Sequence, residues 1–232
     1  MLELFPDGFE EVDHADGVEL VAYTDAAGEE RMWHTFGTAR VRDVANDWEE
    51  RWREFHRPAQ VGDVWIGPPW LDPPEGVKAV VIEPARAFGT GGHPTTRLAL
   101  ALLLRTDRGS VLDIGCGSGV LSIAAAKLGF GPVVAVDVDD AAVAATAANA
   151  AANGVTVAVE RTDARTADLA AVDIALANVT RELAEEVAPR LRSRRLITSG
   201  YLVSDVVALE RPYRHVERVT ETGWAADLFV RE

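Results

Sequence analysis

The stretch DIGCGSG at residues 113–119 decides the fold class of this 232-residue chain. It begins at the end of the apolar run SVLDI and leads into the helix-like run VLSIAAAKL at 120–128. Three alternating glycines, Gly115, Gly117 and Gly119, let the backbone turn sharply and approach a ligand, and the following helix points its positive end at the same place. A nucleotide-type loop is therefore expected. The NAD fingerprint places its third glycine one residue later, at the position of Val120, which weakens the interpretation of an NAD-binding loop. The alternative to a nucleotide-type loop is a tight strand-to-helix turn without a ligand.

Strand-like and helix-like runs alternate on both sides of this loop. Strands are expected at 79–83, 110–114, 132–138, 155–160, 173–178 and 195–200, and helices at 95–104, 120–128, 140–151 and 181–191. Short strands separated by helices of about ten residues indicate βαβ units and a mostly parallel sheet covered on both faces. The sequence thus predicts a three-layer α/β domain. Residues 213–231, broken at Gly223-Trp224, are typical of an antiparallel hairpin added to that sheet.

Asp137 lies at the end of the next expected strand, 132–138, twenty-two positions after Gly115. A carboxylate at this place can accept hydrogen bonds from both hydroxyls of a ribose, and it disfavours a 2′-phosphate. Asp139 and Asp140 are expected to cap the following helix instead. For Asp163, after the third strand, contact with an adenine amine and a plain loop or capping role are equally good interpretations.

Net negative charge and tryptophan residues are concentrated before residue 76. The net charge is −14, and residues 1–30 hold ten acidic residues and no Lys or Arg. Such a balance argues against nucleic acid or an anionic membrane as a direct partner. Five of the six tryptophans lie between 33 and 70. We therefore expect a small acidic N-terminal module at 1–46, an aromatic linker helix and strand at 47–75, and the core domain at 76–232.

Other candidate residues favour structural roles. Cys116 cannot form an internal disulfide, and between glycines it is expected to pack rather than to act as a nucleophile. No His, Cys or carboxylate spacing predicts a metal site. His93 is expected to stabilise its loop, and Trp48, Trp52 and Phe55 follow a helical stripe that is expected to be core. With no leader and no long apolar run, the sequence predicts a soluble protein of the cytoplasm.

A family resemblance rests on four runs: GCGSG with Asp137, EPARAFGTGGHPTT (83–96), ALANVT (175–180) and ITSGYL (197–202). Together they resemble the ribosomal protein L11 methyltransferase family, and DWEERWREFHRPAQVGDVWIGPPW (47–70) resembles the piece that joins its recognition and catalytic domains. The likeness covers roughly 47–232. It implies a Rossmann-like class I S-adenosylmethionine-dependent methyltransferase with an antiparallel C-terminal hairpin and a shortened N-terminal module. Glu83, Ala85, Val179 and Thr180 depart from the usual pattern.

The resemblance also implies site residues at matching positions. Phe88, Thr90 and Thr96 would lie over S-adenosylmethionine, Gly115 and Gly117 would form its loop, and Asp137 would bind its ribose. Asn178 would contact the cofactor near the departing methyl group and act as the catalytic residue. The expected function is methylation of amino groups of a protein, most simply a basic ribosomal protein. The alternatives are the same chemistry on another protein or a small molecule, or a cofactor-binding module without catalysis.

Overall fold

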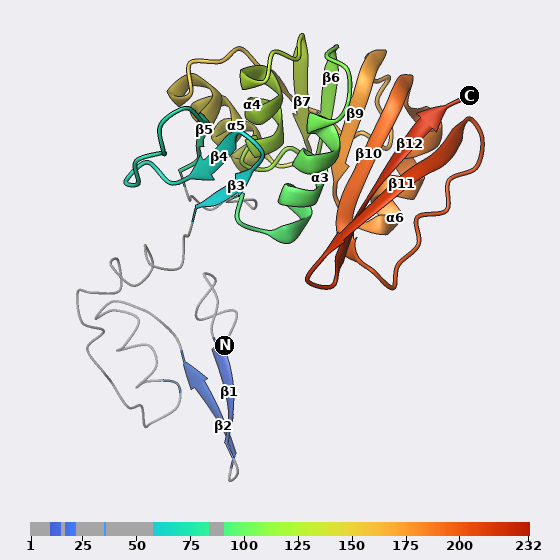
Figure 1. The fold of residues 1–232 in the computed structure, drawn as a ribbon. Helices are drawn as coiled ribbons and strands as arrows, with labels where there is room; N and C mark the ends of the chain where they lie inside the picture. Colours follow the sequence, from blue (N-terminus) through green and yellow to red (C-terminus); the bar gives the residue numbers. More distant parts are fainter. Residues whose placement is uncertain (1–9, 15–16, 22–34, 36–57, 84–90) are drawn as a thin grey trace. The chain divides into compact units, whose positions relative to one another are not determined.

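The computed structural model describes residues 10–14, 17–21, 35, 58–83 and 91–232, and the chain divides into two compact units, Met1–Arg51 and Trp52–Glu232 (Figure 1). In the first unit, β1 (Glu10–His14) and β2 (Gly17–Val21) pair as an antiparallel hairpin. The acidic module predicted at 1–46 lies within this unit, and the linker predicted at 47–75 spans both units. The stripe of Trp48, Trp52 and Phe55 lies outside the described residues.

A seven-stranded sheet forms the centre of the second unit, in the order β11-β12-β10-β9-β6-β7-β8. The five strands from β10 to β8 are parallel, and β12 and β11 are antiparallel additions at one edge. The predicted hairpin is therefore confirmed. The strands are β6 (Val111–Ile114), β7 (Val133–Asp137), β8 (Ala158–Arg161), β9 (Val172–Asn178), β10 (Ser193–Leu202), β11 (Tyr213–Glu221) and β12 (Trp224–Arg231).

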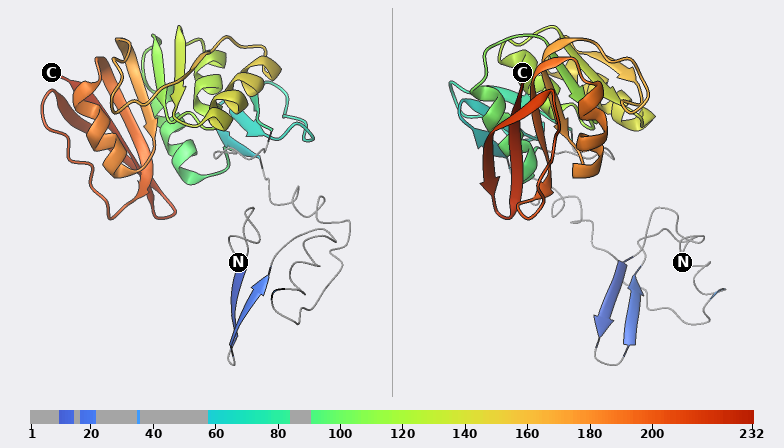
Figure 2. Two further views of the ribbon diagram at one scale, coloured as in Figure 1. Left: turned by 180° about the vertical axis from the view of Figure 1, so that it is seen from behind. Right: turned by 90° about the vertical axis from the view of Figure 1, so that its right-hand side faces the viewer.

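Helices cover both faces of this sheet. Alternate residues of β9 enter two different apolar clusters, because successive side chains of a strand point to opposite faces. Ile174 and Leu176 pack with α3 (Pro94–Leu104), α4 (Val120–Lys127) and α5 (Asp140–Ala152). Ala175 and Ala177 pack with α6 (Arg181–Val187) and the short 3-10 turn η1 (Ala188–Arg190). Figure 2 shows α6 in front of the sheet when the molecule is seen from behind. The three-layer α/β prediction is confirmed.

A small second sheet packs against the first of these clusters. It consists of β3 (Ala59–Val61), β4 (Val64–Gly67) and β5 (Lys78–Val81). Its buried side chains Val64, Ile66 and Val80 belong to the same core as α3 and α4. The run predicted at 79–83 is thus a strand, but assigning it to the alternating parallel sheet was wrong. It pairs with β4, whose four residues are all buried.

Element ends differ from the prediction where tertiary contacts decide them. The helix expected at 181–191 ends at Val187, because Pro189 has no N–H for a further helical bond and the chain tightens into η1. The strand expected at 155–160 begins only at Ala158, where pairing with β7 begins. Val155 and Val157 pack against the core instead. Within the described ranges, no helix combines the length and apolar character needed to cross a membrane.

Candidate active site

The glycine loop follows β6 at the carboxyl edge of the sheet. Gly115, Gly117 and Gly119 all have positive φ, at 69°, 55° and 79°, a conformation that side chains other than glycine rarely adopt. The Gly115 and Cys116 amides both donate to the Val136 carbonyl, at 2.9 and 3.2 Å, which fastens the loop to β7. Gly119 then serves as the N-cap of α4. The predicted sharp strand-to-helix turn is therefore present.

Asp137 ends β7 beside this loop, and its side chain is half-buried. Its Oδ2 accepts a hydrogen bond from the Gly117 amide at 3.0 Å, and its Oδ1 accepts one from the Asp139 amide at 3.1 Å. An ionised carboxylate can accept about four hydrogen bonds. Two acceptor positions therefore remain for the two hydroxyls of a ribose, and the side chain is already oriented by the backbone. Asp139 caps α5 and Asp140 lies in its first turn, as predicted.

Asn178 lies at the end of β9, and the glycine loop approaches the same segment. A Cβ on Gly115 would lie 2.6 Å from Val179 Cγ1, so the absence of a side chain at 115 allows this approach. The Asn178 amide nitrogen, Nδ2, donates to Thr96 Oγ1 at 3.4 Å, and Thr96 lies in the first turn of α3. The remaining amide oxygen, Oδ1, accepts no hydrogen bond from the described part of the chain. It is available to an incoming donor.

These contacts bring five predicted site residues to one edge of the sheet: Thr96, Gly115, Gly117, Asp137 and Asn178. In an open parallel sheet, ligands bind beyond the carboxyl ends of the strands, which is this edge. The glycine loop and the Asp137 carboxylate fit the ribose and the rest of a nucleoside-bearing cofactor. Phe88 and Thr90, also predicted to contact it, lie outside the described residues.

Asp113, a buried carboxylate just before the glycine loop, links β6 to α4. Asp113 is 2% exposed and accepts a hydrogen bond from Ser122 Oγ at 2.5 Å. Burial raises the pKa of Asp113 to about 6, and the nearby Asp137 charge also raises it, although the Ser122 hydrogen bond opposes both. Burial likewise raises the pKa of the Cys116 thiol to about 12. Cys116 is therefore a packing residue rather than a thiolate nucleophile, in agreement with the prediction.

His93 caps α3. Its Nδ1 lies 2.8 Å from Thr95 Oγ1 and accepts from the Thr95 amide at 3.4 Å, so the predicted loop-stabilising role is confirmed. Burial, and then the positive charge of Arg97, lower the pKa of His93 below its usual value. Its ring also contacts the Trp224 ring edge-to-face, at 4.6 Å between centroids. Asp163 accepts from the Arg165 amide at 3.0 Å and pairs with its guanidinium within a turn, which supports the plain loop interpretation.

Sequence reasoning missed the role of Gly200. This glycine lies within β10 at φ 106°, at a register shift between Ser199 and Tyr201. A Cβ at this position would lie 2.1 Å from the Val179 carbonyl oxygen. Gly200 therefore allows β10 to approach the segment that carries Asn178. The available signal was a lone glycine inside a strand, which often marks a bulge or a close backbone approach. Among the described residues, no group of His, Cys, Asp and Glu could hold a metal ion.

The sheet order, the antiparallel hairpin and this glycine–carboxylate site define a class I S-adenosylmethionine-dependent methyltransferase. The family model described as "Ribosomal protein L11 methyltransferase (PrmA)" matches residues 10–231. The chain belongs to that family.

Curated relatives support the assignment. The chain is 37% identical to a ribosomal protein L11 methyltransferase of Myxococcus xanthus, over 80% of this chain and 67% of the relative. It is 40% identical to a protein of the same name from Methylococcus capsulatus, over 85% of this chain and 71% of the relative. For a Gloeobacter violaceus relative, the identity is 41% over 77% of this chain and 58% of the relative.

Solved structures agree on the fold. The ribosomal protein L11 methylase of Lactobacillus delbrueckii subsp. bulgaricus superimposes with a TM-score of 0.69 and 26% identity, over 76% of this chain and 100% of that chain. The putative methyltransferase yhhF of Escherichia coli has a TM-score of 0.52 and 16% identity, over 59% of this chain and 86% of its own. At that identity it supports only the fold.

Proposed function

We propose that this chain transfers methyl groups from S-adenosylmethionine to amino groups of a ribosomal protein, at lysine side chains or the N-terminus. One observation carries the proposal: the glycine loop, through Gly115, and the Asn178 segment meet at the carboxyl edge of the sheet. This juxtaposition suits a site where a cofactor and an acceptor amine are brought together. The names of the relatives favour ribosomal protein L11 as the acceptor.

The cofactor side of the site consists of Gly115, Gly117 and Asp137. Bound S-adenosylmethionine supplies a methyl group on a positively charged sulfur, which is already activated for transfer. The task of the protein is then to fix the geometry of the two reactants, and good alignment can contribute about 7–11 kcal/mol. Phe88, Thr90 and Thr96 are assigned to the same side by the family resemblance.

Asn178 is assigned to the acceptor. A lysine with a pKa of about 10.4 is protonated at pH 7, and neutralising it costs roughly 4–5 kcal/mol at about 1.36 kcal/mol per unit. The free Asn178 Oδ1 can accept a hydrogen bond from the neutral amine and orient its lone pair toward the methyl group. Since an amide has no useful pKa, Asn178 orients the amine and does not act as a general base.

The protein partner is proposed on charge. Residues 1–30 carry ten acidic residues without a Lys or Arg, a composition that would attract a basic ribosomal protein. Because the proposed substrate is a ribosomal protein, we propose that the chain acts in the cytoplasm and binds neither nucleic acid nor membrane directly.

The test uses radiolabelled cofactor. Extract from a strain lacking the gene is incubated with the purified full chain and methyl-labelled S-adenosylmethionine, and labelled bands are identified by mass spectrometry. We expect label in one ribosomal protein, on amino groups. Label in a small molecule or a non-ribosomal protein would contradict the proposed substrate. Calorimetric binding of S-adenosylmethionine without any transfer would contradict catalysis and favour a binding module.

A further inference from the structure

Arg97, in the first turn of α3, connects two distant parts of the chain. Its Nε and Nη2 donate to the Glu221 carboxylate in a bidentate arrangement, with donor–acceptor distances between 2.7 and 3.2 Å. Its Nη1 donates to the Gly92 carbonyl oxygen. One planar guanidinium thus joins the end of β11 to the glycine-rich segment before α3. A planar fork of donors is suited to this, because it fixes direction as well as distance.

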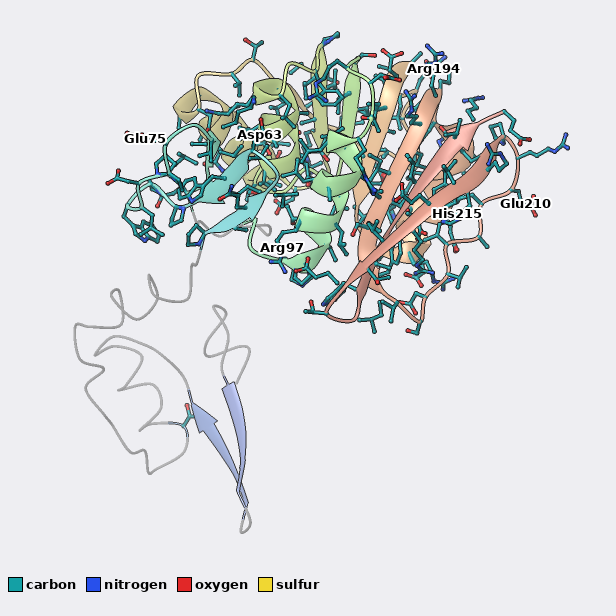
Figure 3. The ribbon with its side chains drawn as sticks, viewed as in Figure 1. Asp63, Glu75, Arg97, Arg194, Glu210 and His215 are labelled. Atoms are coloured by element: carbon teal, nitrogen blue, oxygen red, sulfur yellow. The ribbon has the colours of Figure 1, made fainter. Side chains whose placement is uncertain are left out.

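The hairpin contacts the same segment a second time. Glu221 ends β11, and after the turn at Thr222 and Gly223, Trp224 begins β12. The Trp224 ring packs edge-to-face on His93, the N-cap of α3. Figure 3 labels Arg97 at the lower edge of the domain, the edge at which the turn between β11 and β12 also lies. Two contacts therefore fasten the Gly92–His93 corner to the hairpin.

The opposite side of this corner packs on the small sheet. A Cβ on Gly91 would lie 2.2 Å from Ile66 Cγ2, so the backbone at 91 rests directly on β4. Thr96, which precedes Arg97, contacts Asn178 through its hydroxyl. The orientation of the Asn178 amide therefore depends on how the first turn of α3 is held.

We propose that Arg97 is a positioning residue for methyl transfer. By binding the Gly92 carbonyl and Glu221 together, it fixes the start of α3, and through Thr96 it orients the Asn178 amide toward the acceptor amine. The inference rests on the proposed function for its catalytic part, and on contacts alone for its structural part. It makes the C-terminal hairpin a support of the active site.

The chain offers a matched control. Arg105, at the end of the same helix, pairs with Glu217 of the same strand at 2.8 Å. This second pair also links α3 to β11, and its side chains are 52% and 38% exposed, against 24% and 38% for Arg97 and Glu221. Arg105 lies at the C-cap of the helix, a full helix length from Thr96. Losing this pair removes a more exposed ion pair between the same helix and the same strand, without touching the corner.

The first experiment measures amide hydrogen exchange of the full chain by mass spectrometry. The amides of Thr96 and Arg97 donate to the His93 carbonyl, so their protection reports how firmly the corner is held. Arg97→Gln should speed exchange of the amides at 95–97 about tenfold, because the first turn of α3 loses two hydrogen-bonded partners of Arg97. Arg105→Gln should leave this segment at the wild-type rate. Unchanged exchange in Arg97→Gln, or an equal increase in Arg105→Gln, would overturn the proposal.

The second experiment compares the variants in Tm, and in kcat and S-adenosylmethionine affinity at a temperature below the melting transition of every variant. Arg97→Gln should lower kcat about tenfold or more, because small misplacements of reacting groups are costly. Cofactor affinity should fall by less than kcat, because Gly115, Gly117 and Asp137 are untouched and only Thr96 of the cofactor side lies in the displaced turn. Arg97→Lys, which keeps the charge but not the fork, should recover Tm more than kcat. A kcat for Arg97→Gln equal to that of Arg105→Gln would refute the positioning role. Failure of wild type to methylate would refute the proposed function, while the exchange experiment still decides the structural part.

Discussion

Asp137 accepts two backbone hydrogen bonds and keeps two acceptor positions, so its substitution tests cofactor binding at the scale of a single residue. Asp137→Ala should weaken S-adenosylmethionine binding about 10- to 100-fold, since a hydrogen bond to a charged group contributes about 1.5–3 kcal/mol and about 1.4 kcal/mol corresponds to tenfold. Isothermal titration calorimetry measures this change.

The control is Asp139→Asn. Asp139 caps α5 through the Ala141 amide at 2.9 Å, and asparagine caps helices equally well. Cofactor affinity should stay at the wild-type value in this variant. An equal loss of affinity in both variants would show that the effect of Asp137 is one of general charge near the loop.

Asp113 predicts a pH dependence of stability. Its pKa is raised by burial from 3.8 to about 6, so the folded state binds this proton more tightly than the unfolded state. The associated stability is present below about pH 3.8 and is lost as the pH rises through about 6, a change of about 3 kcal/mol in the free energy of unfolding. Asp113→Asn lacks this titration. The difference in free energy of unfolding between wild type and variant, measured by urea denaturation from pH 4 to 8, should fall and then level above about pH 7. A difference in free energy of unfolding that stays constant with pH would contradict the raised pKa of Asp113.

At the scale of elements, β10 carries a testable constraint at Gly200. Gly200→Ala would place a Cβ 2.1 Å from the Val179 carbonyl oxygen, at a φ of 106°. Besides conformational strain of about 1–3 kcal/mol, the Asn178 segment must move, so both stability and kcat should fall.

Gly129→Ala provides the comparison for this substitution. Gly129 also has positive φ, at 86°, but a Cβ there meets nothing within 4 Å. It should cost only the strain, about 1–2 kcal/mol, and leave kcat unchanged. If Gly200→Ala behaves like Gly129→Ala in denaturation and turnover, the close approach of β10 to Val179 has no functional importance.

The elements that the sequence predicts best are those with strong local signals. The α3, α4 and α5 helices and the β6 and β7 strands start and end close to their expected residues, because caps and glycines mark their ends. β5 and β8 were less predictable. β5 pairs with β4 in a separate sheet, and β8 begins where its pairing with β7 begins. Such pairing is a tertiary property that no local pattern contains.

The same distinction applies to the site. Gly115 and Gly117 follow one strand of the parallel sheet, and Asp137 and Asn178 end two others, so the topology rule places all four at one edge from the sequence alone. Arg97 and Glu221 are separated by 124 positions, and nothing near either residue signals the other. Contacts of that kind require the folded structure.

At the scale of the whole molecule, the uneven charge predicts a salt dependence. If the acidic residues at 1–30 attract a basic substrate, raising salt from 50 to 500 mM should lower kcat/KM several-fold, because screening shortens the range of the attraction to a few ångströms. The variant Glu10→Gln, Glu11→Gln, Asp13→Asn, Glu19→Gln should show a flatter salt dependence. Identical salt profiles for wild type and variant would mean that the acidic segment has no role in recruiting the substrate.

The central claim is that Asn178, held beside the glycine loop, orients an amino group of a ribosomal protein for methyl transfer. The most direct measurement is single-turnover transfer from saturating S-adenosylmethionine to purified, unmethylated ribosomal protein L11, followed by intact mass. We predict whole-methyl mass increments with wild type, and transfer about 100-fold slower with Asn178→Ala, with a much smaller loss of cofactor affinity. Transfer by Asn178→Ala at the wild-type rate, or no mass increment with wild type, would contradict the claim.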